Sequence, residues 1–126
     1  MLRVLVSPGY DSIGCYKDTP RPGDGQRGDP GDEVPSSRAI ETLEGTDHIL
    51  DGSYSTRENP IAKCAVAAMR AGHSMFAVQN GGWCAASATA PQTFDKYGKS
   101  TTCNADGEGG PWGNQVYIIK SKQSIT

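Results

Sequence analysis

The sequence predicts a small α+β domain in which a mostly antiparallel sheet packs on one helix and is stapled by disulfides. Its 126 residues suffice for one compact domain, so we expect a single domain over residues 1–126. Only 36% of the residues are hydrophobic, while 16 are glycine and 8 are proline, which indicates a thin core and a loop-rich backbone. Four cysteines, an even number in a short chain, can cross-link it.

Charge and hydropathy exclude two classes of partner. The chain has 12 Lys and Arg against 14 Asp and Glu, so it lacks the basic excess of a nucleic-acid binder. No stretch approaches the roughly 18 apolar residues of a membrane span, and the apolar run at the start is too short for a signal peptide. We therefore expect a mature secreted chain or one module of a longer protein.

The first third of the chain predicts two short strands and a long loop. Residues 2–6 are expected to form an edge strand that ends at Ser7-Pro8-Gly9, and residues 13–18 a second strand. Residues 19–37 are rich in Gly, Pro and Asp and have no apolar face, which predicts an inserted disordered or mobile loop. This loop contains Arg27-Gly28-Asp29, which resembles an adhesion motif read by integrins; the alternative is a solvated spacer.

The clearest predicted element is a helix over residues 59–72. Asn59 is expected to cap its first turn, Pro60 suits the first helical position, and Gly72 suits a left-handed C-terminal residue. Between them a narrow face of small residues repeats at helical spacing: Ile61, Cys64, Ala65 and Ala68. This helix must pack closely on its neighbour.

A hairpin and a final strand complete the predicted sheet. Residues 74–79 and 82–85 are expected to form the two strands of a hairpin. Asn80-Gly81 between them is a strong signal for a tight turn. Residues 115–120 are β-branched and aromatic, which favours a last strand.

The cysteines are expected to form two disulfides, which implies an oxidising, extracellular setting. Of the three possible pairings, the most economical joins Cys64 on the helix to Cys84 on the hairpin and leaves Cys15 to pair with Cys103. There is no C-x-x-C pair, and only His48 and His73 could add imidazole, so no zinc site is predicted. Since neither histidine has a motif partner, we predict no enzyme activity and no cofactor.

Taken together, several short motifs resemble the WSC domain, an extracellular cysteine-rich module associated with carbohydrate binding, and especially WSC-like modules in secreted proteins of marine invertebrates. The resemblance covers residues 14–119. It rests on segments that keep one order along the chain: Gly14-Cys15-Tyr16-Lys17-Asp18, Arg38-Ala39-Ile40, Lys63-Cys64-Ala65, Ala71-Gly72-His73, Phe76-Ala77-Val78-Gln79-Asn80-Gly81-Gly82-Trp83-Cys84, Tyr97-Gly98-Lys99-Ser100 through Cys103, and Gly107-Glu108-Gly109-Gly110-Pro111-Trp112 before Val116-Tyr117.

The resemblance implies a small sheet with one packed helix, akin to the PAN/apple fold. Two features depart from the family pattern. The family carries about twice as many cysteines. In this chain a small residue near Ala68 replaces the family's second helix cysteine, and Ala85 or Ala86 replaces its second hairpin cysteine. The family also passes quickly from the Cys-Tyr-Lys-Asp strand to Arg-Ala-Ile, so residues 19–37 are an addition of this chain.

Sugar recognition needs flat aromatic faces and fixed amide or carboxylate groups. Aromatic residues in Gly-rich surroundings, with polar residues near them in sequence, are therefore the candidate contacts: Trp83, Tyr97, Trp112, Gln79, Asn80, Asp106 and Asn114. The alternative is that both tryptophans belong to the core. For Asn80 the turn is the stronger explanation. The segment 104–108 alternates oxygen-bearing side chains as in a calcium loop but lacks the distal glutamate, so we expect a plain turn and no metal.

Two functions follow from these observations. The first is a secreted, non-catalytic, lectin-like WSC module that binds glycans or polysaccharide. The second is a structural or adhesive matrix protein that self-associates through sheet edges and displays the Arg-Gly-Asp loop to an integrin.

Overall fold

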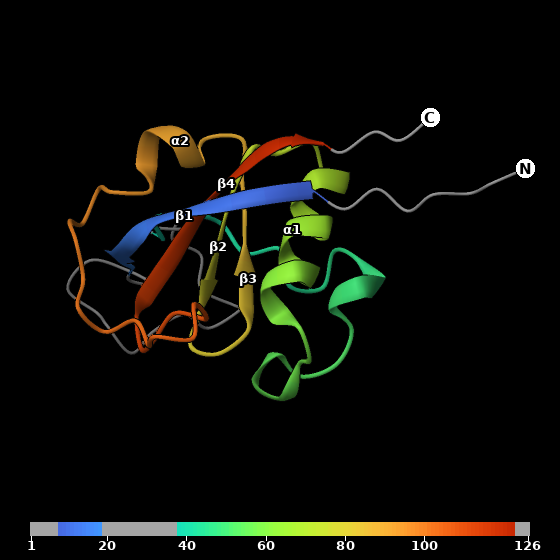
Figure 1. The fold of residues 1–126 in the computed structure, drawn as a ribbon, viewed down its shortest axis with the longest axis horizontal. Helices are drawn as coiled ribbons and strands as arrows, with labels where there is room; N and C mark the ends of the chain where they lie inside the picture. Colours follow the sequence, from blue (N-terminus) through green and yellow to red (C-terminus); the bar gives the residue numbers. More distant parts are fainter. Residues whose placement is uncertain (1–7, 19–37, 123–126) are drawn as a thin grey trace, which may run out of the picture.

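The computed structural model describes residues 8–18 and 38–122, and it is an α+β domain (Figure 1). The predicted strand over residues 2–6 and the inserted segment 19–37 lie outside the described residues. One four-stranded antiparallel sheet has the strand order β1-β4-β2-β3. Its strands are β1 (Pro8–Lys17), β2 (Met75–Gln79), β3 (Trp83–Ala85) and β4 (Gly113–Lys122). The helical elements are α1 (Pro60–Arg70), the short α2 (Ala90–Thr93) and the 3₁₀ turns η1 (His48–Leu50) and η2 (Tyr54–Thr56).

Strand β1 is longer than the sequence predicts. The expected break at Pro8 and Gly9 is wrong, since the strand begins at Pro8. Proline is tolerated there because β1 is an edge strand and Pro8 is its first residue, so the missing N–H interrupts no internal ladder. Register shifts between Pro8 and Tyr10 and between Ser12 and Gly14 adapt this strand to β4.

The predicted hairpin is confirmed. Strands β2 and β3 pair antiparallel, and the backbone at Asn80 (φ 52°) and Gly81 (φ 101°) is left-handed, as a tight hairpin turn of the primed type requires. The N–H of Gly82 donates to the carbonyl oxygen of Gln79 at 3.2 Å and closes this turn. The turn explanation for Asn80 therefore holds.

Helix α1 begins and ends close to the predicted bounds. Gly72 (φ 85°) follows it, and the N–H groups of Gly72 and His73 donate to the carbonyl oxygens of Met69 and Ala68, at 3.0 and 2.9 Å, as in a Schellman motif. The capping role predicted for Asn59 is wrong. Its backbone is left-handed (φ 51°), which asparagine tolerates, and its side chain makes no capping hydrogen bond.

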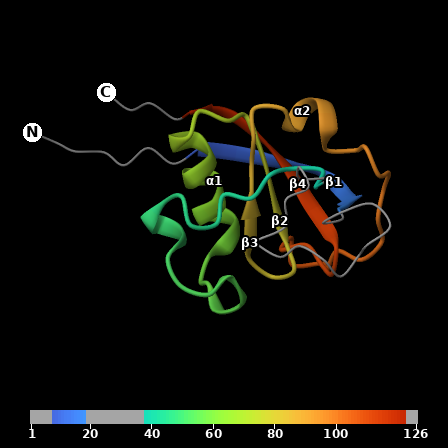
Figure 2. The same cartoon turned by 180° about the vertical axis from the view of Figure 1, so that it is seen from behind.

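The sheet carries apolar layers on both faces. In Figures 1 and 2, helices α1 and α2 lie on opposite sides of the strands. The small residues of α1 meet Phe76, Val78 and Tyr117 on one face. On the other face, Ile40, Met75, Val116 and several alanines form a second core, with partly buried aromatic residues packed against it: Tyr16, Trp83, Phe94 and Tyr97.

Two disulfides tie the elements together, in the pairing that the sequence favours. Cys64 of α1 bonds Cys84 of β3, with an S–S distance of 2.08 Å, and Cys15 of β1 bonds Cys103 at 2.07 Å. Bridges of this kind stabilise small domains by about 2–4 kcal/mol each. They are typical of oxidising compartments rather than of the cytosol.

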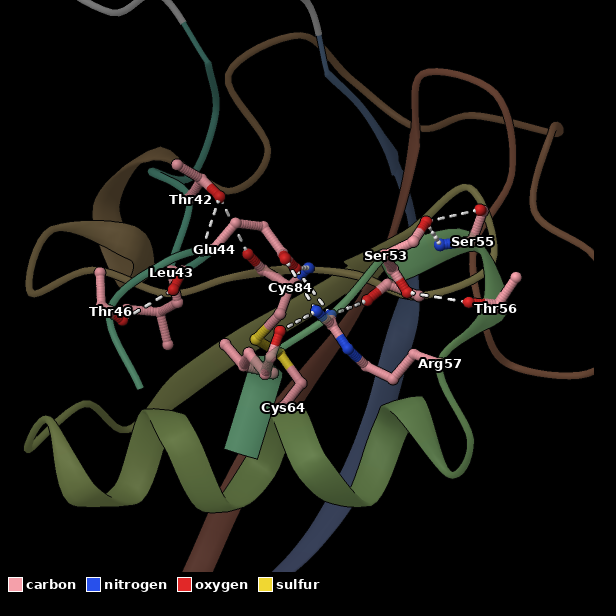
Figure 3. Close-up of polar contacts among 12 residues, drawn as sticks. Thr42, Leu43, Glu44, Thr46, Ser53, Ser55, Thr56, Arg57, Cys64 and Cys84 are labelled. Atoms are coloured by element: carbon pink, nitrogen blue, oxygen red, sulfur yellow. Dashed lines mark hydrogen bonds and ion pairs between the residues drawn. A yellow bond between two sulfur atoms is a disulfide. The ribbon is translucent and has the colours of Figure 1, made fainter. Parts of the chain in front are cut away.

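A buried ion pair next to the first disulfide was not foreseen from the sequence (Figure 3). The guanidinium of Arg57, whose side chain is only 1% exposed, donates to both carboxylate oxygens of Glu44 at 2.8 Å. It also donates to the carbonyl oxygens of Gly82 and Leu50, while Glu44 accepts the N–H of Cys84 at 2.8 Å. This fork fixes the irregular segment before α1 to the hairpin.

Candidate functional site

Two tryptophans from distant parts of the sequence meet at one arginine. The guanidinium carbon of Arg38 lies 4.5 Å from the ring centroid of Trp83 and 5.5 Å from that of Trp112. Contacts of this length are cation–π interactions, which favour a fixed position of both rings. We call these three residues the Trp–Arg–Trp cluster.

Trp112 has an unusual backbone and a partly exposed side chain. It stands with Pro111 at the tip of a tight turn, in which the N–H of Gly113 donates to the carbonyl oxygen of Gly110 at 3.0 Å. Its φ of 51° is the left-handed value that the third residue of a type II turn needs, a place usually taken by glycine. A bulky side chain there costs about 1–2 kcal/mol, and Trp112 still leaves 41% of its surface exposed.

Trp83 differs from Trp112 in its surroundings. It opens strand β3 and is half-buried against the second core. The alternative that both tryptophans belong to the core therefore fits Trp83 in part and Trp112 poorly.

A buried polar network lies under the cluster. The side chain of Asp18 is fully buried and accepts hydrogen bonds from Arg38 Nη1 (3.1 Å), from the backbone N–H of Ala39 (2.7 Å) and from Gln79 Nε2 (2.9 Å). Gln79 Nε2 also donates to Asn114 Oδ1 at 3.0 Å. A buried carboxylate is stable only with such partners. The network therefore sets where Arg38 stands.

Two of the candidate contacts belong to this network rather than to the surface. Gln79 and Asn114 are buried, and Gln79 bonds the Asp18 carboxylate. Of Asn114, Nδ2 has no hydrogen-bond partner among the described residues. The structure thus brings four of the candidate contacts together around Arg38: Trp83 and Trp112 at the surface, Gln79 and Asn114 beneath.

Asp18 and Arg38 are not among the site residues that the sequence predicts. Both stood within motifs of the WSC resemblance, which was the only signal that could have pointed to them. Their pairing brings residues on either side of the segment 19–37 into contact, and no local spacing rule indicates such a contact.

The other candidate contacts lie outside the cluster. Tyr97 packs against the second core, with Lys96 Nζ 5.2 Å from its ring centroid. Asn80 is exposed in the hairpin turn. Asp106 is exposed too, and its carboxylate accepts the backbone N–H of Glu108 at 2.9 Å.

The loop that carries Asp106 is docked toward α1. The hydroxyl of Tyr117, a residue of the core beneath that helix, donates to the carbonyl oxygen of Gly107 at 2.6 Å. Burial raises the pKa of Tyr117 to about 12, with smaller contributions from Tyr10 and from the carboxylates of Asp106 and Glu108. Burial, and then the charge of Asp106, also raises the pKa of Glu108.

A surface hollow lies around the 3₁₀ turn η1 and contains none of the candidate contacts. It is lined by Gly45, Thr46, Asp47, His48 and Asp51. His48 Nδ1 and Asp51 Oδ2 are 3.2 Å apart at its exposed rim. Within residues 8–18 and 38–122, no three His, Cys, Asp or Glu side chains converge as a metal site would require.

Arg27-Gly28-Asp29 lies outside the described residues. No helix in the described part of the chain is both long and apolar enough to cross a membrane. In comparisons with protein-family models, with curated proteins and with solved structures, the chain matches none.

Proposed function

We propose that this chain is a non-catalytic carbohydrate-binding module of WSC-like type that acts outside the cell and binds glycans through the Trp–Arg–Trp cluster. The observation that carries the proposal is Trp112. A large aromatic ring is held partly exposed on a backbone that disfavours it, at 41% exposure and a φ of 51°. Strained, exposed residues of this kind are concentrated at functional sites.

The cluster offers one kind of contact that sugar recognition needs, a fixed aromatic face. An indole face packs against the C–H side of a sugar ring, and it must already be fixed for binding to cost little entropy. Arg38 supplies that fixation, since it lies against both rings and is itself held by the buried carboxylate of Asp18.

The described histidines support a non-catalytic role. His48 is exposed and pairs with Asp51, and His73 follows α1 at the Schellman motif. Neither belongs to the cluster. The two disulfides support an oxidising compartment, which is the basis for proposing secretion.

The alternative, a matrix protein that assembles through its sheet edges, is less well supported. Two register shifts interrupt the β1 edge, and such irregularities hinder pairing with another strand. The outer edge of β3 is already bonded: Leu43 N–H donates to the Cys84 carbonyl oxygen and Ala86 N–H to that of Glu41, both at 2.9 Å.

A glycan array with the oxidised protein tests the proposal. We expect saturable binding that is lost in Trp112→Ala and kept in Ile118→Ala, a matched control because Ile118, among the residues whose burial the structure describes, is a large hydrophobic residue exposed to a similar degree, at 40%. Binding to no glycan, or equal binding by both variants, would contradict the proposal.

A further inference from the structure

The chain segment around Gly98 lies beside the Trp–Arg–Trp cluster at the end of β1. The N–H of Lys17 donates to the carbonyl oxygen of Gly98 at 2.9 Å, and the N–H of the next residue, Asp18, donates to that of Trp112 at 3.0 Å. Consecutive N–H groups of an extended chain point to opposite sides. Gly98 and Trp112 therefore lie on opposite sides of the end of β1. Because neighbouring strands are about 4.8 Å apart, the backbones of Gly98 and Trp112 are roughly 10 Å apart.

This segment places two ammonium groups over aromatic rings. Lys96 Nζ lies 5.2 Å from the ring centroid of Tyr97, and Lys99 Nζ lies 5.9 Å from that of Tyr16. Tyr16 is itself fixed, because it packs edge-on against Phe94 with centroids 4.9 Å apart. Both rings belong to the core that Trp83 also contacts.

The two lysines are exposed, and neither forms an ion pair with any residue that the structure describes. A cation over an aromatic ring keeps N–H donors for other partners, since the ring uses only its charge. An ammonium group without a carboxylate beside it can meet a sulfate or carboxylate of a ligand.

We infer that the glycan is anionic: the sugar rings of a sulfated or carboxylated polysaccharide pack on Trp112 while their acidic groups bind Lys96 and Lys99. This inference rests on the proposed function, because it extends the same face across the end of β1. Asp95, which is exposed next to Lys96, opposes an anionic ligand. Removing its charge therefore strengthens binding.

Dextran and dextran sulfate share one sugar backbone and differ in charge, so titrations with both test the inference. We expect dextran sulfate to bind at least tenfold more tightly. An exposed charge pair contributes up to about 1 kcal/mol, or fivefold, so Lys96→Gln with Lys99→Gln should weaken this binding roughly tenfold. Asp95→Asn should tighten it about twofold to fivefold.

The matched control is Lys63→Gln with Lys120→Gln, which removes the same net charge from α1 and from the far part of β4. It should change the affinity less than twofold. Equal loss in both lysine pairs, or equal affinity for dextran and dextran sulfate, overturns the inference. No binding of dextran sulfate overturns it as well.

The two proposals fail differently. One outcome is that neutral glycans bind in a way that Trp112→Ala abolishes and that Lys96→Gln with Lys99→Gln leaves unchanged. That result would support the proposed carbohydrate-binding module and refute the inference that its ligand is anionic. If dextran sulfate binds but Trp112→Ala leaves its affinity unchanged, the face proposed for sugar recognition is wrong, and with it the inference.

Discussion

Asp18 holds Trp112 in two ways. Its backbone N–H donates to the carbonyl oxygen of Trp112 at 3.0 Å, and its carboxylate bonds Arg38, whose guanidinium carbon lies 5.5 Å from the centroid of the same indole. One residue at the end of β1 thus positions both the main chain and the ring of the exposed tryptophan.

Replacing Asp18 should destabilise the fold. In Asp18→Asn, an amide NH₂ group replaces one carboxylate oxygen and faces N–H donors that now bond the carboxylate. The charged bond between Arg38 and the carboxylate is also lost. We expect a loss of roughly 3 kcal/mol in the free energy of unfolding, measured by urea titration. Asp51→Asn is the control, since its contact with His48 is exposed to solvent and its loss should leave the free energy of unfolding nearly unchanged. An equally small change in both variants would contradict this prediction.

The buried fork of Arg57 should resist even conservative replacement. Lysine keeps the charge but has no planar pair of donors to meet both oxygens of Glu44, so Arg57→Lys should cost roughly 3 kcal/mol. The matched variant Arg70→Lys changes an arginine that is 57% exposed and bonds Asp47, and it should cost less than about 1 kcal/mol. Thermal unfolding of the two variants compares them, and similar melting temperatures would speak against a structural role for the fork.

The two disulfides should be reduced at different rates. Cys64 and Cys84 are fully buried, whereas Cys15 and Cys103 are only half-buried. Because a thiolate must reach a sulfur atom to attack it, Cys15–Cys103 should open first under mild reduction. Alkylation followed by peptide mapping identifies the first free cysteines. Early alkylation of Cys64 or Cys84 would show that the core opens before β1 detaches.

Stability should fall above about pH 10, where an unfolded tyrosine ionises. The pKa of Tyr117 is raised to about 12 in the folded protein, so the folded state keeps a proton that the unfolded state releases. Its contribution is complete below pH 10 and is lost as the pH rises toward 12. Unfolding of the wild type and of Tyr117→Phe across this interval measures it. A pH dependence that is unchanged in Tyr117→Phe would assign the loss to other groups.

Local signals in the sequence predict the fold well. The helical spacing of small residues between Pro60 and Gly72 and the Asn80-Gly81 turn act over a few residues, and each has one strongly preferred backbone geometry. The disulfide pairing followed from the helix and hairpin so placed. These features needed no knowledge of the tertiary structure.

The candidate site is less predictable because long-range contacts build it. Trp83 and Trp112 could be named as aromatic residues in Gly-rich segments, but the contact between Asp18 and Arg38 joins chain positions with the segment 19–37 between them. The left-handed backbone of Trp112 contradicts its own preference, and it occurs in the turn closed by Gly110 and Gly113 and held by the N–H of Asp18. Interactions of this kind override local propensity, so a sequence pattern does not reveal them.

The central claim is that Trp112 serves binding rather than packing, and Trp112→Gly tests it most directly. Glycine adopts φ near 50° without strain, so this variant should be more stable than Trp112→Ala by about 1 kcal/mol. We predict that it still unfolds in one cooperative transition and loses glycan binding. A protein that is destabilised by 3 kcal/mol or more, or that binds glycans as the wild type does, would contradict the claim.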